Sequence, residues 1–560
     1  MAKIQELKIK NFRGIKEFFY TFNNKNLICL VGRGDSGKTT ILDAISYVLS
    51  SSWNLTFFDS DFYKCDINTP IEIEVTLIDL PENLILENKY GLYIRGLDKS
   101  TSTIKDDLEN DHEKALTIKL EINKDLEPKW CVINNRQNSP TSISAYDRAK
   151  LNVFMISDYI DRHFSWSKGN PLYSLLKQQK NSVDSEGNNI IIEALREAKS
   201  KIDNNSFVQF EEITGIVKSK ADELGIDISN TSTSIDFKNI SVKDGRVCLH
   251  DDKIPFRLKG KGTKRLISIA IQMLLVGSGG IMLIDEIEQG LEPDRVKHLV
   301  RTFYKEFKGQ IFIATHSQSV IEELEVQNIL IINNEKGNVK CEEIEEEFQD
   351  VIRACPEAVY AKKVIICEGK TEIGICKALD SYRIKKGKSN MSSLGVVYTG
   401  GGGDNFYKRA SKLKELGKKV CVLCDSDKSE IIDKKNKLRD SGIKVIDCKQ
   451  SNAIENQVFN DLPWDAIRKL IIYEEKKSSE KAVEYNVNSR FTESLTTNWQ
   501  QTDSTAKREA LGKTAKDSRW FKQIAQGEYL GTVIFGYFDQ IKDKELGKQF
   551  GELSKWIDDD

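Results

Sequence analysis

The residues from Gly32 to Thr39 follow the spacing G-x-x-x-x-G-K-[ST], the pattern of a loop that binds phosphate groups. In such a loop the glycines let backbone N–H groups turn towards phosphate oxygens, Lys38 contacts the β- and γ-phosphates, and Thr39 binds Mg²⁺. The apolar run 27–31 before the loop and the amphipathic segment after it predict a strand and a helix. We therefore expect a nucleoside triphosphate site lined by Gly32, Gly34, Asp35, Ser36, Gly37, Lys38, Thr39 and Thr40.

A second pair of candidate residues, Asp285 and Glu286, directly follows the apolar run 281–284. A continuous apolar run is typical of a buried parallel strand, and ligands gather at the carboxyl ends of such strands. We expect Asp285 to bind Mg²⁺ or to face it, and Glu286 to polarise the water that attacks the nucleotide. Gly290-Leu291-Glu292-Pro293 comes next, and a further apolar run, 311–314, leads into Thr315-His316-Ser317.

Residues 266–284 are apolar over nearly the length of a membrane span. Glycines at positions 277, 279 and 280 interrupt this stretch, and two carboxylates end it. A helix, a turn and a buried strand explain the stretch better than a membrane span. The first residues of the chain lack the apolar core of a signal peptide, so we expect a cytoplasmic protein that does not enter a membrane.

Carboxylates at predicted strand ends recur in the second half of the chain. The apolar run 363–367 ends at Glu368, and the run 419–424 ends at Asp425-Ser426-Asp427. Carboxylates at the ends of neighbouring parallel strands converge, repel one another and raise each other's pKa, and Mg²⁺ or Mn²⁺ relieves that repulsion. Two such cations about 4 Å apart can support phosphodiester cleavage. The D-x-D pattern alone also fits a helix cap or a turn.

Composition sets wider limits on the chain. A length of 560 residues predicts two to four domains, and a formal net charge of −2 decides nothing about nucleic acid, because a local basic patch is what binds it. The eleven cysteines show no disulfide-scaffold rhythm, which agrees with a reducing compartment. Cys421 and Cys424 form a lone C-x-x-C inside an apolar run, which favours strand packing over zinc.

The order of motifs in the first half resembles the ATP-binding-cassette ATPases of the SMC/Rad50 and OLD (overcoming lysogenisation defect) type. In that resemblance residues 4–12 and the turn after them form an opening hairpin, and Arg13 approaches the nucleotide. Gly260 and Gly262 take the place of the signature loop, which presents backbone N–H groups to the γ-phosphate on a second subunit. Lys259 stands where the family has Ser, which bears on the efficiency of hydrolysis.

The same resemblance implies that His316 is the switch histidine. No glutamine can be assigned to the Q-loop, for which Gln137 and Gln178 are the candidates. Residues 193–225 have helical spacing, but there is no room for the long coiled-coil arm of Rad50 and SMC proteins. OLD-like proteins are therefore the better match, and the signature loop implies a homodimer or a higher homo-oligomer.

The second half resembles a Toprim domain, whose hallmark is a strand-end Glu followed later by a strand-end D-x-D. The OLD branch adds Glu372 and Glu455 as metal ligands beside Glu368, Asp425 and Asp427. It also implies a lysine that neutralises charge on the scissile phosphate, for which Lys516 is the first candidate and Lys513 the second. A solvent-exposed helix face is the alternative explanation for both lysines.

The resemblance covers nearly the whole chain and implies an α/β protein. An ABC-type P-loop ATPase domain is expected at residues 1–355, with a helical insertion at about 160–230. A doubly wound Toprim nuclease domain with a C-terminal helical extension follows at residues 356–560.

These domains imply an ATP-binding endonuclease that cuts double-stranded DNA with Mg²⁺ or Mn²⁺, with Glu368, Asp425, Asp427, Lys516 and Glu286 as the catalytic residues. OLD-like proteins include anti-phage nucleases such as Gabija, so defence and a companion protein are part of the expectation. The alternative is a regulatory or scaffolding ATPase that does not cut DNA. A topoisomerase or a primase fits poorly, because a nucleophilic Tyr domain and a zinc module are missing.

Overall fold

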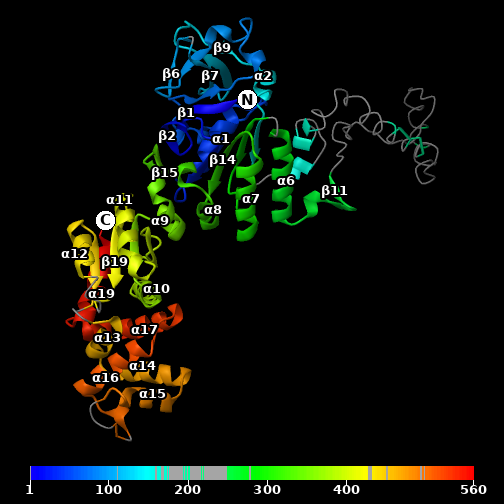
Figure 1. Cartoon of the computed structure of the whole chain (residues 1–560). Coiled ribbons are helices and arrows are strands. Elements are labelled where there is room, and N and C mark those ends of the chain that lie inside the picture. Colours follow the sequence, from blue (N-terminus) through cyan, green and yellow to red (C-terminus); the bar gives the residue numbers. More distant parts are fainter. Residues whose placement is uncertain are drawn as a thin grey trace. The chain divides into compact units, whose positions relative to one another are not determined.

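The computed structural model describes residues 2–559, apart from positions 110, 158–160, 165–169, 277–278, 427–431, 449–451, 492–494 and 497 and most of residues 173–248. It divides into two compact units (Figure 1). The first comprises Met1–Leu30, Asp35–His316 and Ile332–Cys341, and the second comprises Val31–Gly34, Ser317–Ile331 and Glu342–Asp560. The helical insertion predicted at about 160–230, including the helix at 193–225, lies mostly outside the described residues, as does Gln178.

A large mixed sheet forms the core of the first part of the chain. Its strand order is β10-β13-β14-β3-β15-β16-β2-β1-β4-β7-β5-β6, with β8 and β9 added beside β7. The bounds are β1 Lys3–Phe12, β2 Ile15–Thr21, β3 Leu27–Val31, β4 Ile71–Ile78, β5 Arg95–Asp98, β6 Thr103–Lys105, β7 Glu113–Ile122, β8 Pro128–Ile133, β9 Thr141–Ser142, β10 Val153–Ile156, β13 Ile281–Ile284, β14 Gln310–Thr315, β15 Ile329–Glu335 and β16 Asn338–Glu343.

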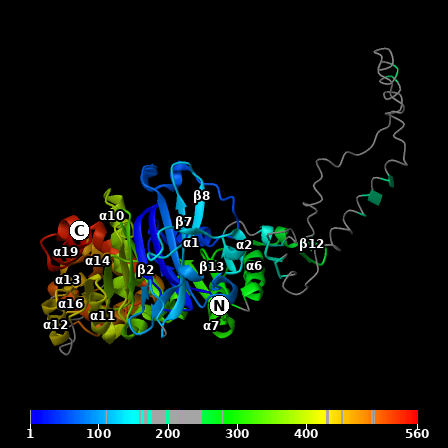
Figure 2. The ribbon, with the colours of Figure 1, turned by 90° about the horizontal axis from the view of Figure 1, so that it is seen from above.

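The sheet has a parallel part and an antiparallel part. β13 lies between β10 and β14 and is parallel to both, and its four residues are fully buried, as their apolar run predicts. β1 and β2 form the predicted antiparallel hairpin, which continues through β4 and β7 (Figure 2). A short ribbon pairs β11 (His250–Asp251) with β12 (Ile254–Pro255).

Four α-helices of this unit lie among the described residues outside positions 171–248. Their bounds are α1 Lys38–Val48, α2 Ala145–Ala149, α6 Lys261–Val276 and α7 Pro293–Glu306. α6 and β13 account for the apolar stretch 266–284, as a helix and a buried strand. Among the helices that the structure describes, none combines the length and the apolar character needed to cross a membrane.

A four-stranded parallel sheet, in the order β18-β17-β19-β20, forms the core of the second unit. Its strands are β17 Lys363–Cys367, β18 Val396–Gly400, β19 Lys419–Cys424 and β20 Lys444–Asp447. Cys421 and Cys424 are both buried in β19, which fits packing rather than a zinc site. The parallel order and the helices between the strands confirm the doubly wound α/β prediction.

Many helices accompany this sheet. Their bounds are α8 Gln318–Glu323, α9 Gln349–Ala354, α10 Lys370–Lys385, α11 Phe406–Glu415, α12 Ile432–Asp440, α13 Ile454–Asp461, α14 Trp464–Lys477, α15 Glu480–Asn488, α16 Thr505–Asp517, α17 Ile524–Gly536, α18 Phe538–Ile541 and α19 Glu545–Asp558. α10 and α17 pack unusually closely, because a Cβ on Gly374 would lie 2.3 Å from the carbonyl oxygen of Ile524. Likewise, a Cβ on Gly527 would lie 2.5 Å from the carbonyl oxygen of Thr371. These glycines fix the start of α17 against the start of α10.

Candidate functional site

The phosphate-binding loop joins β3 to α1 as predicted. Gly37 ends the loop with a φ of 101°, a left-handed conformation that glycine adopts without strain. Lys38 begins α1 and is buried, and its Nζ donates to the Ser36 hydroxyl at 3.2 Å. Burial lowers the pKa of Lys38, and the nearby carboxylates of Asp285 and Asp35 oppose that shift. A buried ammonium beside a helix N-terminus suits an anionic phosphate chain.

Thr39 and Asp285 meet across this loop. The Thr39 hydroxyl donates to Oδ1 of Asp285 at 3.1 Å, so the residue expected to bind Mg²⁺ contacts the strand-end acid of β13. Burial raises the pKa of Asp285 to about 6, the Thr39 hydrogen bond lowers it, and the charge of Glu286 raises it again. A divalent cation would offset the cost of burying the charged form of Asp285. The Thr39 hydroxyl and the Asp285 carboxylate are oxygen ligands of the kind that Mg²⁺ prefers, so they fit the implied ion. Glu286 is exposed, as a residue that faces the attacking water must be.

Glu288 is a site residue that the sequence analysis missed. Its carboxylate accepts from the Thr315 hydroxyl at 2.7 Å and from the His316 backbone N–H at 2.7 Å. Glu288 therefore holds the last residue of β14, Thr315, and the backbone of His316, the predicted switch histidine. Burial lowers the pKa of His316, and so does the charge of Lys38. In the sequence, the only indication of this role is that Glu288 is a third acid close behind Asp285 and Glu286.

The signature loop is tied to the same edge of the sheet. Buried Arg265 of α6 donates to the backbone carbonyl of Asp285 and, at 2.9 Å, to the side chain of Gln289. A Cβ on Gly262 would lie 2.3 Å from the carbonyl oxygen of Gly290, so only glycine permits this approach. These contacts therefore hold the start of α6 against the loop after Glu286. Gly260 precedes α6 and is exposed.

Arg13 has partners of its own in this structure. Its guanidinium forms ion pairs with Asp43 of α1 and, at 2.9 Å, with Asp61, and it donates to the Tyr47 hydroxyl at 3.1 Å. These contacts attach the opening hairpin to α1. The predicted approach of Arg13 to the nucleotide stays a prediction.

The second unit brings Glu368 and Asp425 together. β17 and β19 are neighbours, and Oε2 of Glu368 accepts from the backbone N–H of Asp425 at 2.9 Å. Oδ1 of Asp425 in turn accepts from the backbone N–H of Ile454, at the start of α13, at 2.8 Å. Burial raises the pKa of Asp425 well above its ordinary range, and the charges of Glu372 and Glu455 add to the shift. The predicted convergence of strand-end carboxylates is therefore observed for these two residues.

Glu372 and Glu455 complete a buried acidic group. Glu372 lies in the first turn of α10, where its Oε2 accepts from the Gly369 N–H at 2.8 Å, and burial raises its pKa to about 7. Glu455 lies in the first turn of α13 and is fully buried. Its Oε1 is 2.6 Å from Nζ of Lys522, while its Oε2 has no hydrogen-bond partner among the described residues.

These four acids fit a divalent cation by two criteria. Burial and the charges of neighbouring carboxylates raise the pKa of Glu372 and Asp425, and Oε2 of Glu455 has no hydrogen-bond partner among the described residues. A bound cation would relieve both. No three of Glu368, Glu372, Asp425 and Glu455 bring their oxygens within 4.8 Å of one another. In this arrangement at most two of the four could hold one ion directly, and water would supply the other ligands that Mg²⁺ needs.

Lys522 contacts this acidic group through its ion pair with Glu455. It precedes α17, and the charges of Glu455 and Asp425 raise its pKa against the opposing effect of burial. Lys516, the first candidate from the sequence, lies half-buried in the last turn of α16, and Lys513 is exposed on the same helix. Asp427, predicted as a metal ligand and catalytic residue, lies outside the described residues.

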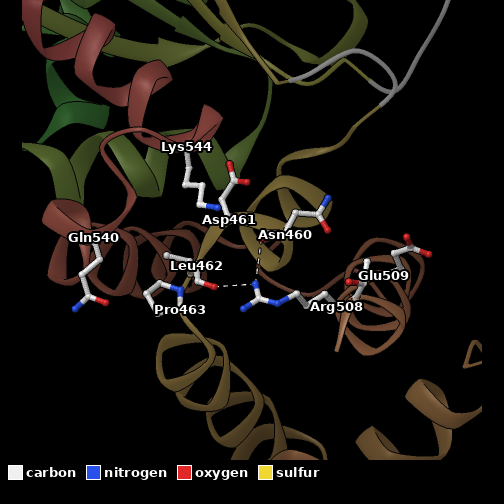
Figure 3. Close-up of a pocket in the computed structure, with 9 residues that line it drawn as sticks. Asn460, Asp461, Leu462, Pro463, Arg508, Glu509, Gln540 and Lys544 are labelled. Carbon is white, nitrogen blue, oxygen red and sulfur yellow. Dashed lines mark hydrogen bonds between the residues drawn. The ribbon is translucent and has the colours of Figure 1, made fainter. Parts of the chain in front are cut away.

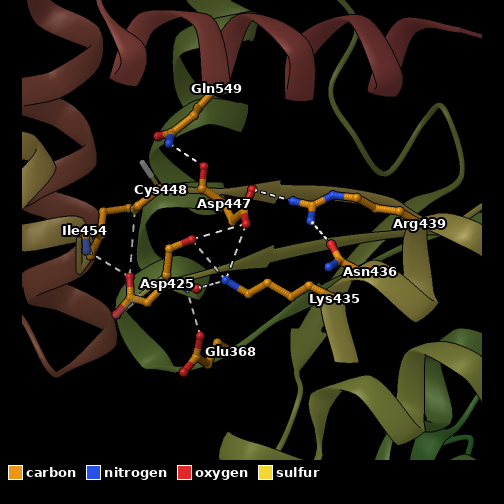
Figure 4. A network of polar contacts seen from close by, with 10 residues as sticks. Glu368, Asp425, Lys435, Asn436, Arg439, Asp447, Cys448, Ile454 and Gln549 are labelled. Atoms are coloured by element: carbon orange, nitrogen blue, oxygen red, sulfur yellow. Dashed lines mark hydrogen bonds and ion pairs between the residues drawn. The ribbon is translucent and has the colours of Figure 1, made fainter. Parts of the chain in front are cut away.

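A second polar network supports the strand ends (Figure 4). Lys435 of α12 is buried and donates to the backbone carbonyl of Asp425 and, at 3.0 Å, to the Ser426 hydroxyl. Asp447, the last residue of β20, lies 3.4 Å from Nζ of Lys435 and 2.8 Å from Nη2 of Arg439. This network holds the turn after β19, which carries Asp425.

α13 is fixed from its other end. Nη1 of Arg508 donates to the carbonyl oxygens of Phe459, Asn460 and Leu462 at 2.8–3.1 Å, which satisfies the end of the helix (Figure 3). A hollow of about 650 Å³ lies beside it, lined by Asn460, Asp461, Leu462, Pro463, Thr505, Arg508, Glu509, Gln540 and Lys544. Because the guanidinium already has these acceptors, we assign Arg508 to positioning α13 and, through it, Glu455.

Comparison with known proteins agrees with this order of sites. The AAA ATPase domain family matches residues 2–321, and the family described as overcoming lysogenization defect protein-like, TOPRIM domain, matches residues 359–427. No curated protein matches the chain in sequence.

Solved structures that match include an Smc head domain and the recombination mediator protein RecF. The Smc head domain of Pyrococcus furiosus, with an extended coiled coil and bound to the C-terminal domain of ScpA, is 14% identical, covers 63% of this chain and 98% of its own, and has a TM-score of 0.36. The recombination mediator RecF is 12% identical over 61% of this chain and 98% of its own, with a TM-score of 0.32. The family assignment rests on the two family matches and not on these structures. The chain therefore belongs to the AAA ATPase domain family and, with an OLD-like Toprim domain behind the ATPase, to the OLD family of ATPase–Toprim proteins.

Proposed function

We propose that this protein is an ATP-binding, divalent-metal-dependent endonuclease that cuts double-stranded DNA. The observation that supports cutting best is the meeting of Glu368 and Asp425 at adjacent strand ends, 2.9 Å apart from carboxylate to backbone N–H. Two further buried acids and a lysine surround them. A scaffold would gain nothing from four repelling carboxylates at one edge of a sheet, because burying two of them, Glu372 and Glu455, costs free energy that packing alone does not return.

Each residue has a role in the proposed reaction. A Mg²⁺ or Mn²⁺ ion bound there supplies an activated water and charge to stabilise the leaving oxygen of a phosphodiester. Glu368 and Asp425 would hold an ion from two adjacent strands, and Glu372 and Glu455, in the first turns of α10 and α13, would act through water or on a second ion. Asp427, the second acid of the D-x-D pattern, is a further candidate ligand from the sequence. Lys522 holds a positive charge at the same place and would neutralise charge on the scissile phosphate.

Nucleotide binding in the first unit is the proposed control of cutting. Lys38, Thr39 and Asp285 would bind ATP with Mg²⁺, and Gly260 and Gly262 would complete the site of a second subunit. The active form would then be a homodimer or a higher homo-oligomer in the cytoplasm. A role in anti-phage defence, with a companion protein, rests on the family resemblance alone.

Plasmid DNA tests the proposal. Supercoiled plasmid incubated with the purified protein should be nicked and linearised with Mg²⁺ or Mn²⁺ present, and ATP should change the rate. EDTA should stop the reaction. The alternative, a scaffolding ATPase, predicts intact plasmid under every combination of metal and nucleotide.

A further inference from the structure

The end of α16 and the turn that leads to α17 form a basic stretch of the second unit. Cations recur there at every third position: Lys513, Lys516, Arg519 and Lys522. The one acid among them, Asp517, is paired with Arg490, whose Nε lies 2.9 Å from its carboxylate. The stretch therefore keeps a positive charge that its own acid does not cancel.

Both ends of this stretch contact the first turn of α13 (Figure 1). Lys522 pairs with Glu455 at one end. At the other end, a Cβ on Gly512 would lie 3.0 Å from the side-chain nitrogen of Asn456, the next residue of α13. Between them, Trp520 is buried with its ring against an aromatic ring of α13. The stretch is therefore held in a fixed place beside the acidic group.

Arg519 has a backbone conformation that favours glycine. Its φ is 57°, and it is the residue at which the chain leaves α16. The N–H of Arg519 donates to the carbonyl oxygen of Lys516 at 3.2 Å, and the next N–H, that of Trp520, donates to Ala515 at 2.8 Å. This pair of hydrogen bonds is the Schellman ending of a helix, where glycine is usual because a side chain strains the backbone. Local structure therefore does not account for an arginine here.

The guanidinium of Arg519 is available to a ligand. The side chain is exposed, and it forms no hydrogen bond or ion pair with the residues that the structure describes. Two arginines near it are occupied, Arg490 by Asp517 and Arg508 by the end of α13. The fork of a guanidinium matches two oxygens of a phosphate and remains charged at any pH at which DNA is bound.

We propose that Arg519 binds a backbone phosphate of the DNA next to the phosphate held at the acidic group. The choice of DNA as the ligand rests on the proposed function. Three residues of chain span at most about 10 Å, so Arg519 and Lys522 can reach phosphates close together on one strand. Arg519 would then align the strand without touching the bond that breaks. The structural alternative is a solvated surface arginine in a strained turn.

DNA binding measured without cleavage tests the proposal. Fluorescence anisotropy of a labelled duplex with the full-length protein, in EDTA and separately in Ca²⁺, gives the affinity over a range of salt concentrations. Arg519→Gly should weaken binding roughly tenfold and reduce the slope of log affinity against log salt by about 1, as expected for one lost phosphate contact. Its urea unfolding midpoint should equal or exceed that of the wild type, because glycine relieves the backbone strain.

Lys336→Gly is the matched control. Lys336 is also an exposed cation with a positive φ, 54°, and it lies in the first unit. This variant should keep the wild-type affinity and salt slope. Arg519→Gln, which keeps most of the side chain but not its charge, should bind DNA as weakly as Arg519→Gly, and Arg519→Lys should keep more of the affinity.

Wild-type affinity with an unchanged salt slope in a folded variant without the charge, Arg519→Gly or Arg519→Gln, would overturn the proposal. An equal loss of affinity in Lys336→Gly, or a wild type that does not bind the duplex in either condition, would overturn it as well. The plasmid experiment decides the nuclease separately. A duplex bound through Arg519 but never cut would support this proposal and remove the proposed function.

Discussion

Oε2 of Glu368 accepts the backbone N–H of Asp425 at 2.9 Å, so the ends of β17 and β19 are joined by one of the carboxylates expected to bind metal. The distance is short because the two strands are parallel neighbours with Cys367 opposite Leu423. This hydrogen bond shows that Glu368 and Asp425 lie at the same edge of the sheet. The predictions below follow from what surrounds this pair.

Glu372 should make the protein less stable as the pH rises. Its pKa is raised from 4.5 to about 7, first by burial and then by the charges of Glu368 and Glu455. Between these values the folded state keeps a proton that the unfolded chain has released, so the free energy of unfolding falls as the pH rises from about 4.5 to about 7. The loss is on the order of 3 kcal/mol for this group.

Glu372→Gln isolates that effect, because glutamine still accepts the Gly369 N–H without ionising. Urea unfolding at about pH 5 and about pH 7.5 should show a smaller pH dependence in this variant than in wild type. Glu415→Gln, an exposed change at the end of α11, should behave like wild type. Equal pH dependence in Glu372→Gln and wild type would contradict the assignment, and added Mg²⁺ should restore stability to wild type at the higher pH.

Lys38→Ala should remove nucleotide binding and leave the fold intact. The ammonium group would make charge-assisted hydrogen bonds to two phosphates, and its loss should cost about 3 kcal/mol or more, roughly a hundredfold in affinity. Calorimetric titration with ATP and Mg²⁺ measures it. Lys253→Ala, at an exposed lysine of the same unit, is the control, and unchanged affinity in Lys38→Ala would remove the basis for the phosphate-loop assignment.

Lys522→Met should abolish metal-dependent DNA cutting, whereas Lys516→Met should retain it. Lys522 pairs with fully buried Glu455, so the variant should also lose stability without metal, because the buried charge is left unpaired; the loss should be smaller than for a pair buried at both ends, since the Lys522 side chain is 41% exposed. Added Mg²⁺ should recover part of that loss but not the cutting. Lys548→Met, at an exposed position of α19, controls for the loss of a surface charge. Full activity in Lys522→Met with lost activity in Lys516→Met would reverse the assignment in favour of Lys516.

Glu288→Gln should slow ATP hydrolysis and leave ATP binding nearly unchanged. The two carboxylate oxygens hold Thr315 and the backbone of His316 separately, and glutamine retains one acceptor. Loss of one such hydrogen bond costs about 1–2 kcal/mol, or roughly tenfold in rate if His316 acts in hydrolysis. Phosphate release with a parallel binding titration checks this, and a variant that hydrolyses ATP at the wild-type rate would exclude Glu288 from positioning the switch.

The acids of the strand ends could be predicted from sequence because their environment is local. A continuous apolar run predicts a buried strand, and the residue directly after it must lie at the sheet edge, as Asp285, Glu368 and Asp425 do. Glu372 follows from its place in the first helical turn after Glu368.

Lys522 could not be predicted in the same way. Its place depends on the packing of α17 against α10 through Gly374 and Gly527, a contact between segments about 150 residues apart. Nothing in the residues around it distinguishes it from Lys516. Lys435 lies only 10 residues after Asp425, but its burial depends on how α12 packs against the end of β19, which its own neighbours in sequence do not indicate.

The most direct test of the nuclease is a comparison of Asp425→Asn with wild type on supercoiled plasmid. Asparagine still accepts the Ile454 N–H but offers a metal no charge, so the fold should persist while nicking and linearisation with Mg²⁺ or Mn²⁺ disappear. Asp433→Asn, at an exposed position of α12, should cut like wild type, and ATP affinity should be the same in all three proteins. Plasmid cut by Asp425→Asn at the wild-type rate would contradict a metal-dependent nuclease centre at this edge of the sheet.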